Sequence, residues 1–376
     1  DLALWIEKEF GYPPGADDAL QTVGDVWLAA CGQILAAGLD ALKPIPPAWF
    51  RPSSLPPSIP PGDTLPAVFL AQARRGPDRI AVADQLRGAL SYRDLILAIR
   101  VLLPHLRKIE GPYVGVLLPA AAGTAAVLLA IQFAGKTPVL INWTTGARNI
   151  LHGLNGLNVR TVVGSRRLLQ RLESQGAGLS ELAERLLALE DLPTRISRGA
   201  KLAAFLRARS GLWGLDALPI APTAAVLFTS GSENLPKAVP LSHANLLANL
   251  RDALQVFTLQ PQDRVLGMLP PFHSFGLTCT LFLPLLTGIR AVYHPNPTEG
   301  GQLARLIEAY RVTLLAGTPT FVAGILRAAA DPQIASLRRL ITGAEKCPDA
   351  LHDEIARRLP QARLIEGYGI TECSPI

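Results

Sequence analysis

The sequence predicts an α/β protein in which short, buried, parallel strands alternate with helices in layers. Beyond residue 62, apolar runs of strand length are separated by longer runs with helical spacing. The clearest strand candidates are Arg79–Asp84, Val114–Pro119, Thr137–Asn142 and Arg160–Gly164, and the clearest helix candidate is Leu179–Glu190. Apolar strands that alternate with helices are typical of a three-layer arrangement around a parallel sheet.

The apolar composition makes a membrane span the first alternative to weigh. Hydrophobic residues make up 49% of the 376 residues, charged residues 18%, and the mean hydropathy is +0.27. The most apolar stretch, Tyr113–Gly135, is close to the roughly 20 residues that a span needs. Pro119 and Gly123 interrupt it, so the pattern favours a buried strand, a turn and a buried helix.

The charge of the chain is modest and mostly scattered. A net charge of +6 does not by itself indicate nucleic-acid binding, and we expect no such partner. One stretch, Leu192–Leu215, has no acidic residue and mixes leucine, phenylalanine and tryptophan with Arg195, Arg198, Lys201, Arg207 and Arg209. It could contact anionic lipid or an acidic protein, or be the solvated face of a connecting helix.

The cysteines indicate a reducing compartment, which fits a cytoplasmic protein. No two of them form a C-x-x-C pair, and their spacing suggests neither a disulfide framework nor a zinc site. The four are Cys31, Cys279, Cys347 and Cys373.

The chain divides by composition into three parts. Residues 1–38 contain two helix patterns, Asp1–Gly11 and Leu20–Leu35. The segment Lys43–Pro61 holds eight prolines, which favours an extended, semi-rigid linker. We therefore predict a small helical unit at 1–38, a linker at 39–62 and a large α/β domain at 63–376.

A loop of small hydroxyl residues follows the strand candidate Ala224–Thr229. Ser230, Gly231 and Ser232 come next, and Lys237 stands six residues after Gly231. Converging backbone N–H groups, hydroxyls and one mobile cation suit a polyphosphate. The loop is not a Walker A sequence, because no glycine directly precedes the lysine. An ordinary strand–turn–helix with exposed serines has the same composition.

A second strand candidate leads into Gly367, Tyr368 and Gly369, followed by Thr371 and Glu372. The glycines let the backbone approach a ligand, and the tyrosine ring can lie against a planar group. A threonine beside a carboxylate suits a phosphate oxygen and a hard cation such as Mg²⁺. Alone, the segment is also compatible with a plain turn.

Two further segments leave room for a ligand. His273 lies between aromatic residues after a Pro-Pro pair, in the stretch Leu269–Thr278, where packing alone would also explain it. A third strand candidate ends in a turn at Gly343 and Ala344, and a helix resumes near Pro348. Small residues in that turn leave space for a flat group.

Together these four segments resemble the adenylate-forming enzymes in order, content and spacing. "FTSGSENLPKAV" resembles their phosphate loop, "PFHSFG" their aromatic gate, "TGAEK" their adenine-side turn and "GYGITE" their Tyr-Gly-x-Thr-Glu signature. The resemblance is specific over 227–376 and looser back to Asp63. It is greatest to the acyl-[acyl-carrier-protein] synthetase half of bifunctional acylglycerophosphoethanolamine acyltransferases.

The N-terminal unit resembles the second half of an acyl carrier protein, through an acidic helix, a loop and "TVGDV". Any two-helix cap would have a similar pattern. If the resemblance holds, the serine that carries phosphopantetheine precedes Asp1.

The resemblance implies the layered sheets and helices of the large N-terminal domain of adenylate-forming enzymes. It implies that ATP and Mg²⁺ activate a fatty acid to an acyl-adenylate, which passes to the phosphopantetheine thiol of an acyl carrier protein that could be fused to the chain. Two alternatives stay open: a ligase that uses coenzyme A, and a non-catalytic module that binds nucleotide or acyl chains.

The resemblance also assigns residues. Those expected to hold the triphosphate are Thr229, Ser230, Gly231, Ser232, Glu233 and Lys237. Those expected around the adenine are Gly343, Ala344, Glu345, Gly367, Tyr368 and Gly369. Glu372 would bind Mg²⁺, Thr371 the α-phosphate, and His273 would border the acyl tunnel.

The chain departs from the family pattern at two loop positions and at its end. Asn234 and Ala238 stand where the family usually has glycine, which puts the mobility of the loop in doubt. A ribose-binding aspartate and a lid lysine would follow Ile376. We therefore expect this chain alone to turn over poorly in ATP–pyrophosphate exchange, and any membrane attachment could come from parts beyond it.

Overall fold

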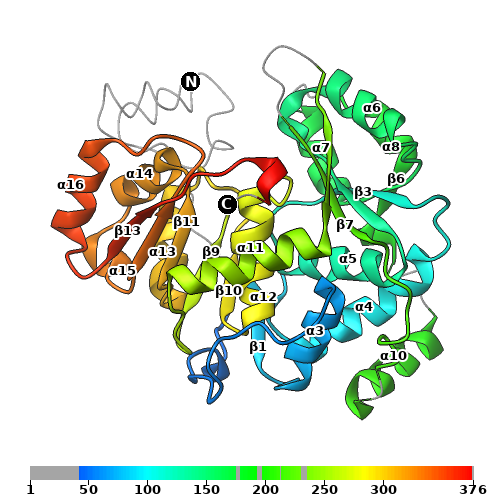
Figure 1. Cartoon of the computed structure of the whole chain (residues 1–376), viewed down its shortest axis with the longest axis horizontal. Helices are drawn as coiled ribbons and strands as arrows, with labels where there is room; N and C mark the ends of the chain where they lie inside the picture. The colour runs from blue at the N-terminus through cyan, green and yellow to red at the C-terminus, as the bar shows by residue number, and fades with distance from the viewer. Residues whose placement is uncertain (1–41, 175–177, 193–196, 212, 230–234, 375–376) are drawn as a thin grey trace.

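Two sheets organise the described part of the molecule, as the family resemblance implied, whereas the alternation of strands and helices alone suggested one sheet. The computed structural model describes residues 42–174, 178–192, 197–211, 213–229 and 235–374 (Figure 1). The strand order is β13-β12-β11-β9-β10-β1-β2 in the larger sheet and β6-β5-β3-β4-β7-β8 in the smaller. The predicted helical unit at 1–38 lies outside the described residues.

The seven-stranded sheet is parallel apart from its last pair, β1 and β2, which is antiparallel. Its strands are β1 Ile80–Asp84, β2 Gly88–Ser91, β9 Arg264–Gly267, β10 Arg290–Tyr293, β11 Leu314–Gly317, β12 Arg339–Thr342 and β13 Arg363–Glu366. Side chains of β9, β10 and β11 are buried throughout, as expected for parallel strands covered on both faces.

The six-stranded sheet is parallel except for the hairpin partners β7 and β8. Its strands are β3 Tyr113–Leu117, β4 Thr137–Leu140, β5 Val162–Gly164, β6 Leu186–Ala188, β7 Thr223–Phe228 and β8 Ala238–Ser242. The four clearest strand candidates are confirmed, as β1, β3, β4 and β5.

The prediction of one helix over Leu179–Glu190 is wrong for the second half of this segment. Helix α8 ends at Arg185, and the next three residues form β6, which pairs in parallel with β5 at the edge of the sheet. The apolar residues keep helical spacing through Leu186–Ala188. These residues nevertheless form a strand, because they pair with an open edge of the sheet.

Helices cover both sheets and fill the space between them (Figure 1). The α-helices of six or more residues are α3 Leu65–Arg74, α4 Tyr92–Leu106, α5 Ala122–Phe133, α6 Ala147–Gly156, α7 Arg166–Ser174, α8 Ser180–Arg185, α10 Arg198–Ser210, α11 His243–Val256, α13 Gly300–Tyr310, α14 Pro319–Ala328 and α16 Asp349–Arg358. The other helices are η2 Pro47–Trp49, η3 Trp143–Thr145, η4 Leu189–Asp191, the π-helix η5 Gly276–Phe282, α12 Leu283–Thr287, α15 Asp331–Ile334 and η6 Thr371–Cys373.

Helix α5 is the buried helix predicted within Tyr113–Gly135. It packs on β1 of one sheet and on β4 of the other, and nearly all its side chains are buried. Its alanines let both sheets approach closely. Within the described part of the chain, no helix combines the length and the apolar character needed to cross a bilayer.

The proline-rich segment lies against the seven-stranded sheet and its helices instead of standing apart as a spacer. Trp49 is fully buried, donates its Nε1–H to the Tyr310 carbonyl at 3.0 Å and packs edge-on against the Tyr310 ring. Arg290 donates to the Arg51 carbonyl. The boundary between a linker at 39–62 and a domain at 63–376 stays a prediction.

Candidate active site

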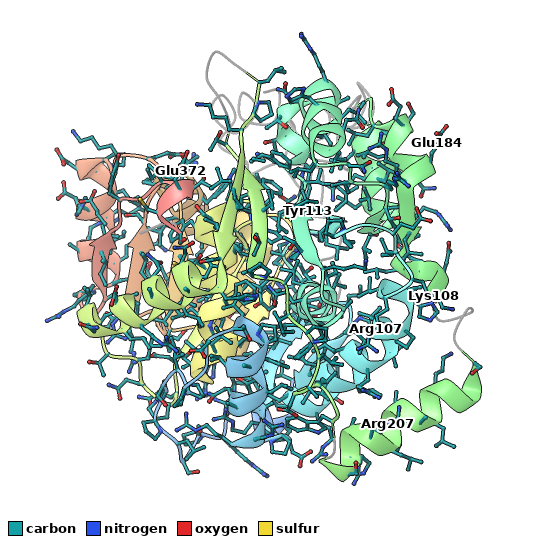
Figure 2. The ribbon with its side chains drawn as sticks, turned by 45° about the vertical axis from the view of Figure 1, so that its right-hand side comes forward. Arg107, Lys108, Tyr113, Glu184, Arg207 and Glu372 are labelled. Atoms are coloured by element: carbon teal, nitrogen blue, oxygen red, sulfur yellow. The ribbon has the colours of Figure 1, made fainter. Side chains whose placement is uncertain are left out.

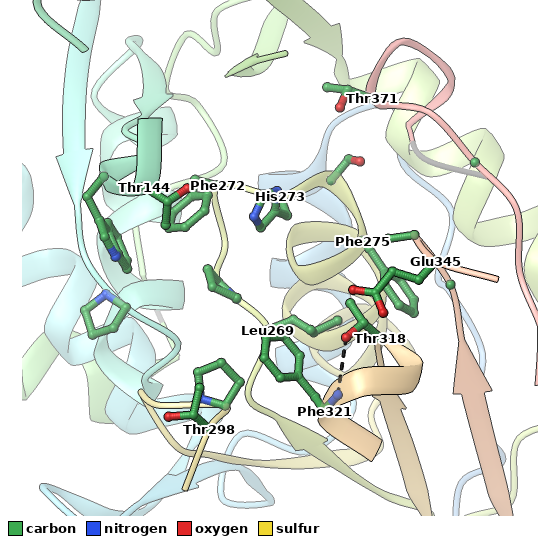
Figure 3. Close-up of a pocket in the computed structure, with 18 of the residues that line it drawn as sticks. Thr144, Leu269, Phe272, His273, Phe275, Thr298, Thr318, Phe321, Glu345 and Thr371 are labelled. Carbon is green, nitrogen blue, oxygen red and sulfur yellow. Dashed lines mark hydrogen bonds between the residues drawn. The ribbon is translucent and has the colours of Figure 1, made fainter. Parts of the chain in front are cut away.

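A cavity of about 1020 Å³ opens where the carboxyl ends of strands from both sheets meet (Figure 3). Eight strands end there, and the residues after each contribute to its lining: Pro119 after β3, Trp143 and Thr144 after β4, Thr229 after β7, Leu269 to Phe275 after β9, Pro295 to Thr298 after β10, Thr318 after β11, Gly343 to Glu345 after β12, and Gly367 to Glu372 after β13. Ligands of open α/β sheets bind at this edge.

The turn after β12 is built tightly against the turn after β13. Gly367 donates its N–H to the Thr342 carbonyl at 2.7 Å. A Cβ on Gly343 would lie 3.0 Å from the Gly367 carbonyl oxygen, and Ala344 has a φ of 67°. The strands and small-residue turns predicted here are confirmed, and they form one wall of the cavity.

The carboxylate of Glu345 is fixed in this wall. The Thr320 hydroxyl of α14 donates to its Oε2 at 2.6 Å. Figure 3 shows Glu345 near Phe275 and Thr318 at the cavity. The Thr318 hydroxyl accepts from the Phe321 N–H at 3.3 Å and thereby caps α14.

The segment after β13 carries an exposed tyrosine and the carboxylate predicted to bind metal. The Tyr368 ring is 88% exposed, which leaves its face available to a planar ligand. Helix η6 lies beside β8, so Thr371 and Glu372 face the same cavity as Thr229. Thr278 of η5 donates to the Ser374 carbonyl at 2.9 Å and holds the end of this segment.

The predicted phosphate loop is described only at its two ends. Thr229 donates its N–H to the Lys237 carbonyl at 3.0 Å, which extends the β7–β8 hairpin. Ser230, Gly231, Ser232, Glu233 and Asn234 lie outside the described residues. Thr229 lines the cavity, whereas Lys237 is not among the described lining residues. Ala238 begins β8 opposite Phe228 without a positive φ, so replacing the usual glycine has no backbone cost there.

An aromatic cluster joins the two sheets at the cavity. The Phe272 ring lies 4.4 Å from the Trp143 ring centroid, nearly perpendicular to it, and 4.6 Å from the His273 ring. His273 is exposed toward the cavity (Figure 3), yet desolvation by the surrounding protein lowers its pKa, so the neutral form is favoured at neutral pH. His273 therefore both packs against Phe272 and lines the cavity.

Gly276 allows the segment around His273 to close. A Cβ at this position would lie 2.3 Å from the Pro270 carbonyl oxygen, which is an impossible contact. Directly after this turn the chain continues as the π-helix η5, a type of helix that is frequent beside functional sites.

Few charges line the cavity. Of the described lining residues, the charged ones are Arg171, Glu345 and Glu372. No lysine or arginine of the described ranges forms an ion pair with Glu372, so its carboxylate is available. Mg²⁺ binds with one or two carboxylates together with substrate phosphates and waters, which this residue fits.

The profile of the family described as "AMP-binding enzyme" matches residues 69–376. The chain belongs to this family. The chain is 34% identical over 159 residues to 4-coumarate--CoA ligase 3 of Arabidopsis thaliana, covering 41% of this chain and 28% of that protein. It is 28% identical over 162 residues to a long-chain-fatty-acid--CoA ligase of Bacillus subtilis, again covering 41% and 28%.

A solved nonribosomal peptide synthetase has the same fold, with a TM-score of 0.67, 22% identity, and coverage of 86% of this chain and 33% of that one. The adenylate-forming fold class predicted from the sequence is thus confirmed. The chain spans between 28% and 62% of the length of the first curated relatives that it matches.

Three groups that line the cavity escaped prediction. Trp143 and Arg171 come from separate elements of the six-stranded side, and neither stands in a motif. The turn after β10 is shaped by Glu299, which accepts from Asn296 at 2.9 Å and contacts the His294 Nε2 at 2.7 Å. The sequence offers one signal for this turn, which is the close spacing of His294, Asn296 and Glu299.

Proposed function

We propose that this chain carries the nucleotide-binding part of an enzyme that activates a fatty acid with ATP and transfers the acyl group to the phosphopantetheine thiol of a carrier protein. One observation carries the proposal: Thr229, the Gly343–Glu345 turn and the Thr371–Glu372 pair line a single cavity. Groups suited to a triphosphate, an adenine and a metal ion thus share one site.

The first step brings two anions together. A carboxylate oxygen of the acid attacks the α-phosphorus of ATP, a new P–O bond forms, and the bond to pyrophosphate breaks. Positioning and charge neutralisation are what the protein must supply. The Thr371 hydroxyl would donate to an α-phosphate oxygen, and Tyr368 would stack on the adenine beside Gly343 and Ala344.

Glu372 would hold Mg²⁺, which when bound neutralises phosphate charge. Thr229 and Lys237 would contact the outer phosphates from the two ends of their loop. The neutral His273, with Phe272 and Trp143, would border the acyl group, because an uncharged aromatic surface accepts an apolar chain without a desolvation penalty.

The second step transfers the acyl group to a thiol. The thiolate attacks the acyl carbonyl carbon, a C–S bond forms, and AMP leaves with the C–O bond broken. The curated relatives named as coenzyme A ligases favour coenzyme A as the alternative acceptor. The alternative that is not an enzyme is a non-catalytic module that binds nucleotide or acyl chains. The presence of Asn234 where the family usually has glycine is the remaining observation in its favour.

Pyrophosphate exchange by the full-length protein tests the proposal. Purified protein, Mg-ATP and labelled pyrophosphate are combined with fatty acids of graded length and with aromatic acids. We expect label to enter ATP only when a suitable acid is present. Binding of Mg-ATP and an acyl-adenylate mimic without exchange would instead identify the non-catalytic module.

The acceptor is determined in a second assay. Transfer from the acyl-adenylate to a holo-carrier protein is compared with transfer to free coenzyme A, and we expect the carrier to be preferred. A preference for coenzyme A would replace the carrier part of the proposal. We place the reaction in the cytoplasm, which fractionation of cells that express the full-length protein would check.

A further inference from the structure

Helix α10 presents its large apolar side chains to solvent and its small ones to the protein. Leu202, Phe205 and Leu206 are 58%, 44% and 58% exposed, whereas Ala204 and Ala208 are buried and the helix packs on α4. A helix that only connects two elements usually turns leucine and phenylalanine inward, because their burial stabilises it. The arrangement in α10 is the reverse.

The orientation of this face is fixed by contacts at the C-terminal end of α10. Arg93 of α4 donates to the Ala208 carbonyl at 2.7 Å, and the buried Trp213 donates its Nε1–H to the same carbonyl at 3.3 Å. Arg93 also pairs with Asp78 at 2.7 Å. The exposed apolar side chains therefore project from an anchored helix.

Cations surround the apolar face. Lys201, Arg207 and Arg209 on α10 are exposed, and the Arg209 guanidinium lies 5.8 Å from the centroid of the Phe205 ring. Arg107 and Lys108, at the end of α4, lie on the same side of the molecule (Figure 2). Burial, together with Arg207 and Arg107, lowers the pKa of Arg100, so the cations of both helices lie close together.

Two nearby acids pair with arginines outside α10, Asp216 with Arg74 and Glu110 with Arg160. Asp78 pairs with Arg93, and the charge of Arg209 on α10 further lowers its pKa, so this one carboxylate partly offsets the cations. The exposed face of α10 thus combines uncovered apolar groups with an excess of positive charge.

We propose that α10 binds the surface of a membrane that contains anionic lipid. Leu202, Phe205 and Leu206 would enter the boundary between headgroups and acyl chains, while Arg207 and Arg209 would contact lipid phosphates. One apolar face flanked by lysine and arginine is the pattern of helices that lie in the membrane interface.

An acidic protein is the other partner with matching charge, and the position of α10 argues against it. Figure 2 places Arg207 of α10 and Glu372 on opposite sides of the molecule. A carrier protein docked on α10 would have to deliver its thiol to a cavity on the far side. A lipid surface requires only that the apolar face be accessible.

Co-sedimentation with vesicles tests the proposal. The full chain is mixed with vesicles of phosphatidylcholine alone and of phosphatidylcholine with phosphatidylglycerol, without ATP or acid. We expect binding to the anionic vesicles, weakened by salt. The triple change Leu202→Gln, Phe205→Gln and Leu206→Gln should weaken partitioning at least tenfold, and glutamine keeps the helix propensity close to that of leucine.

The charge contribution is measured separately. The double change Arg207→Gln and Arg209→Gln should lower partitioning into anionic vesicles by roughly fivefold for each cation removed. The matched control is Leu86→Gln with Val256→Gln, which removes apolar groups that are 71% and 81% exposed on other elements and should leave binding unchanged. Thermal unfolding of each variant checks that the fold is retained.

Two results would overturn the proposal: vesicle binding by the triple variant that equals that of the wild type, or an equal loss of vesicle binding in the control variant. In the first case, binding of the triple variant to an acidic holo-carrier protein is measured as well, and we ask whether that binding is lost. Loss of carrier-protein binding together with unchanged vesicle binding would assign α10 to a protein partner. Because the assay contains neither ATP nor acid, its outcome is independent of the proposed enzymatic function.

Discussion

The two sheets contribute different chemistry to the one cavity. The seven-stranded sheet supplies the two carboxylates of the described lining, Glu345 and Glu372, and turns that are locked by backbone contacts. The six-stranded sheet and its helices supply Thr229 after β7, the apolar Trp143, Leu168 and Leu172, and the cation Arg171. The walls meet at the contact between Trp143 and Phe272.

This difference indicates a division of work between the two walls. A polyphosphate and a metal ion need fixed polar groups, since preorganised dipoles stabilise developing charge most effectively. An acyl chain needs only an apolar surface of suitable size. Changes in the turns after β12 and β13 should therefore affect the chemical step, and changes at Trp143, Leu168 and Leu172 should affect the choice of acid.

Removing the charge of Glu372 should have the largest effect. In the full-length protein, Glu372→Gln keeps the shape of the side chain but weakens the hold on the metal, so exchange of pyrophosphate should fall by about 10²- to 10³-fold. The matched control on the other wall is Arg171→Gln. This variant should change the exchange rate by less than about tenfold. An equal loss of exchange rate in both variants would contradict the different roles that we infer for the two walls.

Gly276→Ala should produce the next largest effect, on stability. The added Cβ would meet the Pro270 carbonyl at 2.3 Å, so the backbone beneath His273 must shift. We expect a loss of about 3 kcal/mol of unfolding free energy, measured by urea denaturation. Gly156→Ala is the control, because a Cβ there meets nothing within 4 Å. It should be neutral or slightly stabilising.

The sequence predicts best what depends on neighbouring residues. The strands before Thr229, Gly343 and Gly367 were found because an apolar run that ends in small residues is a local signal. Their meeting at one cavity follows from the rule for the carboxyl ends of parallel strands. The resemblance to a known family then supplied the roles, which stay predictions.

The sequence fails where distant contacts decide the structure. Leu186–Ala188 has helical spacing, yet it pairs with β5 at a sheet edge. The prolines around Trp49 are typical of a linker, yet that tryptophan packs on Tyr310, which is 261 positions away. Arg171 reaches the cavity only because α7 lies beside it. None of these contacts leaves a pattern in a short stretch of sequence.

The buried contact between the start of α11 and the start of α3 should respond to acid. His243 accepts the Leu65 N–H on Nδ1 at 3.2 Å and donates from Nε2 to the Ala221 carbonyl at 3.1 Å, and burial lowers its pKa to about 4. The unfolded chain therefore binds a proton more readily than the folded one, and stability is lost as pH falls from about 6.5 toward 4. The free energy of unfolding should be about 2 kcal/mol lower at pH 5 than at pH 7.

The control for this pH effect is His105→Gln, at the end of α4, which should leave the difference in place. His243→Gln should lower stability at both pH values and flatten the dependence between them. Urea denaturation of the three proteins measures both quantities, and an unchanged slope in His243→Gln would assign the acid sensitivity to another group.

The smallest predicted effect concerns how η6 is held against the cavity. Thr278→Val removes the hydroxyl that donates to the Ser374 carbonyl but preserves the shape of the side chain. Losing one such bond should weaken the positioning of Glu372 by about 1 kcal/mol, which corresponds to a rise in the KM for Mg-ATP of roughly fivefold. Thr280→Val is the matched control, because the Thr280 hydroxyl bonds to the Gly276 carbonyl inside the same π-helix. If both variants raise KM equally, the effect comes from the helix itself, whereas a rise confined to Thr278→Val shows that the seven-stranded wall depends on this tether.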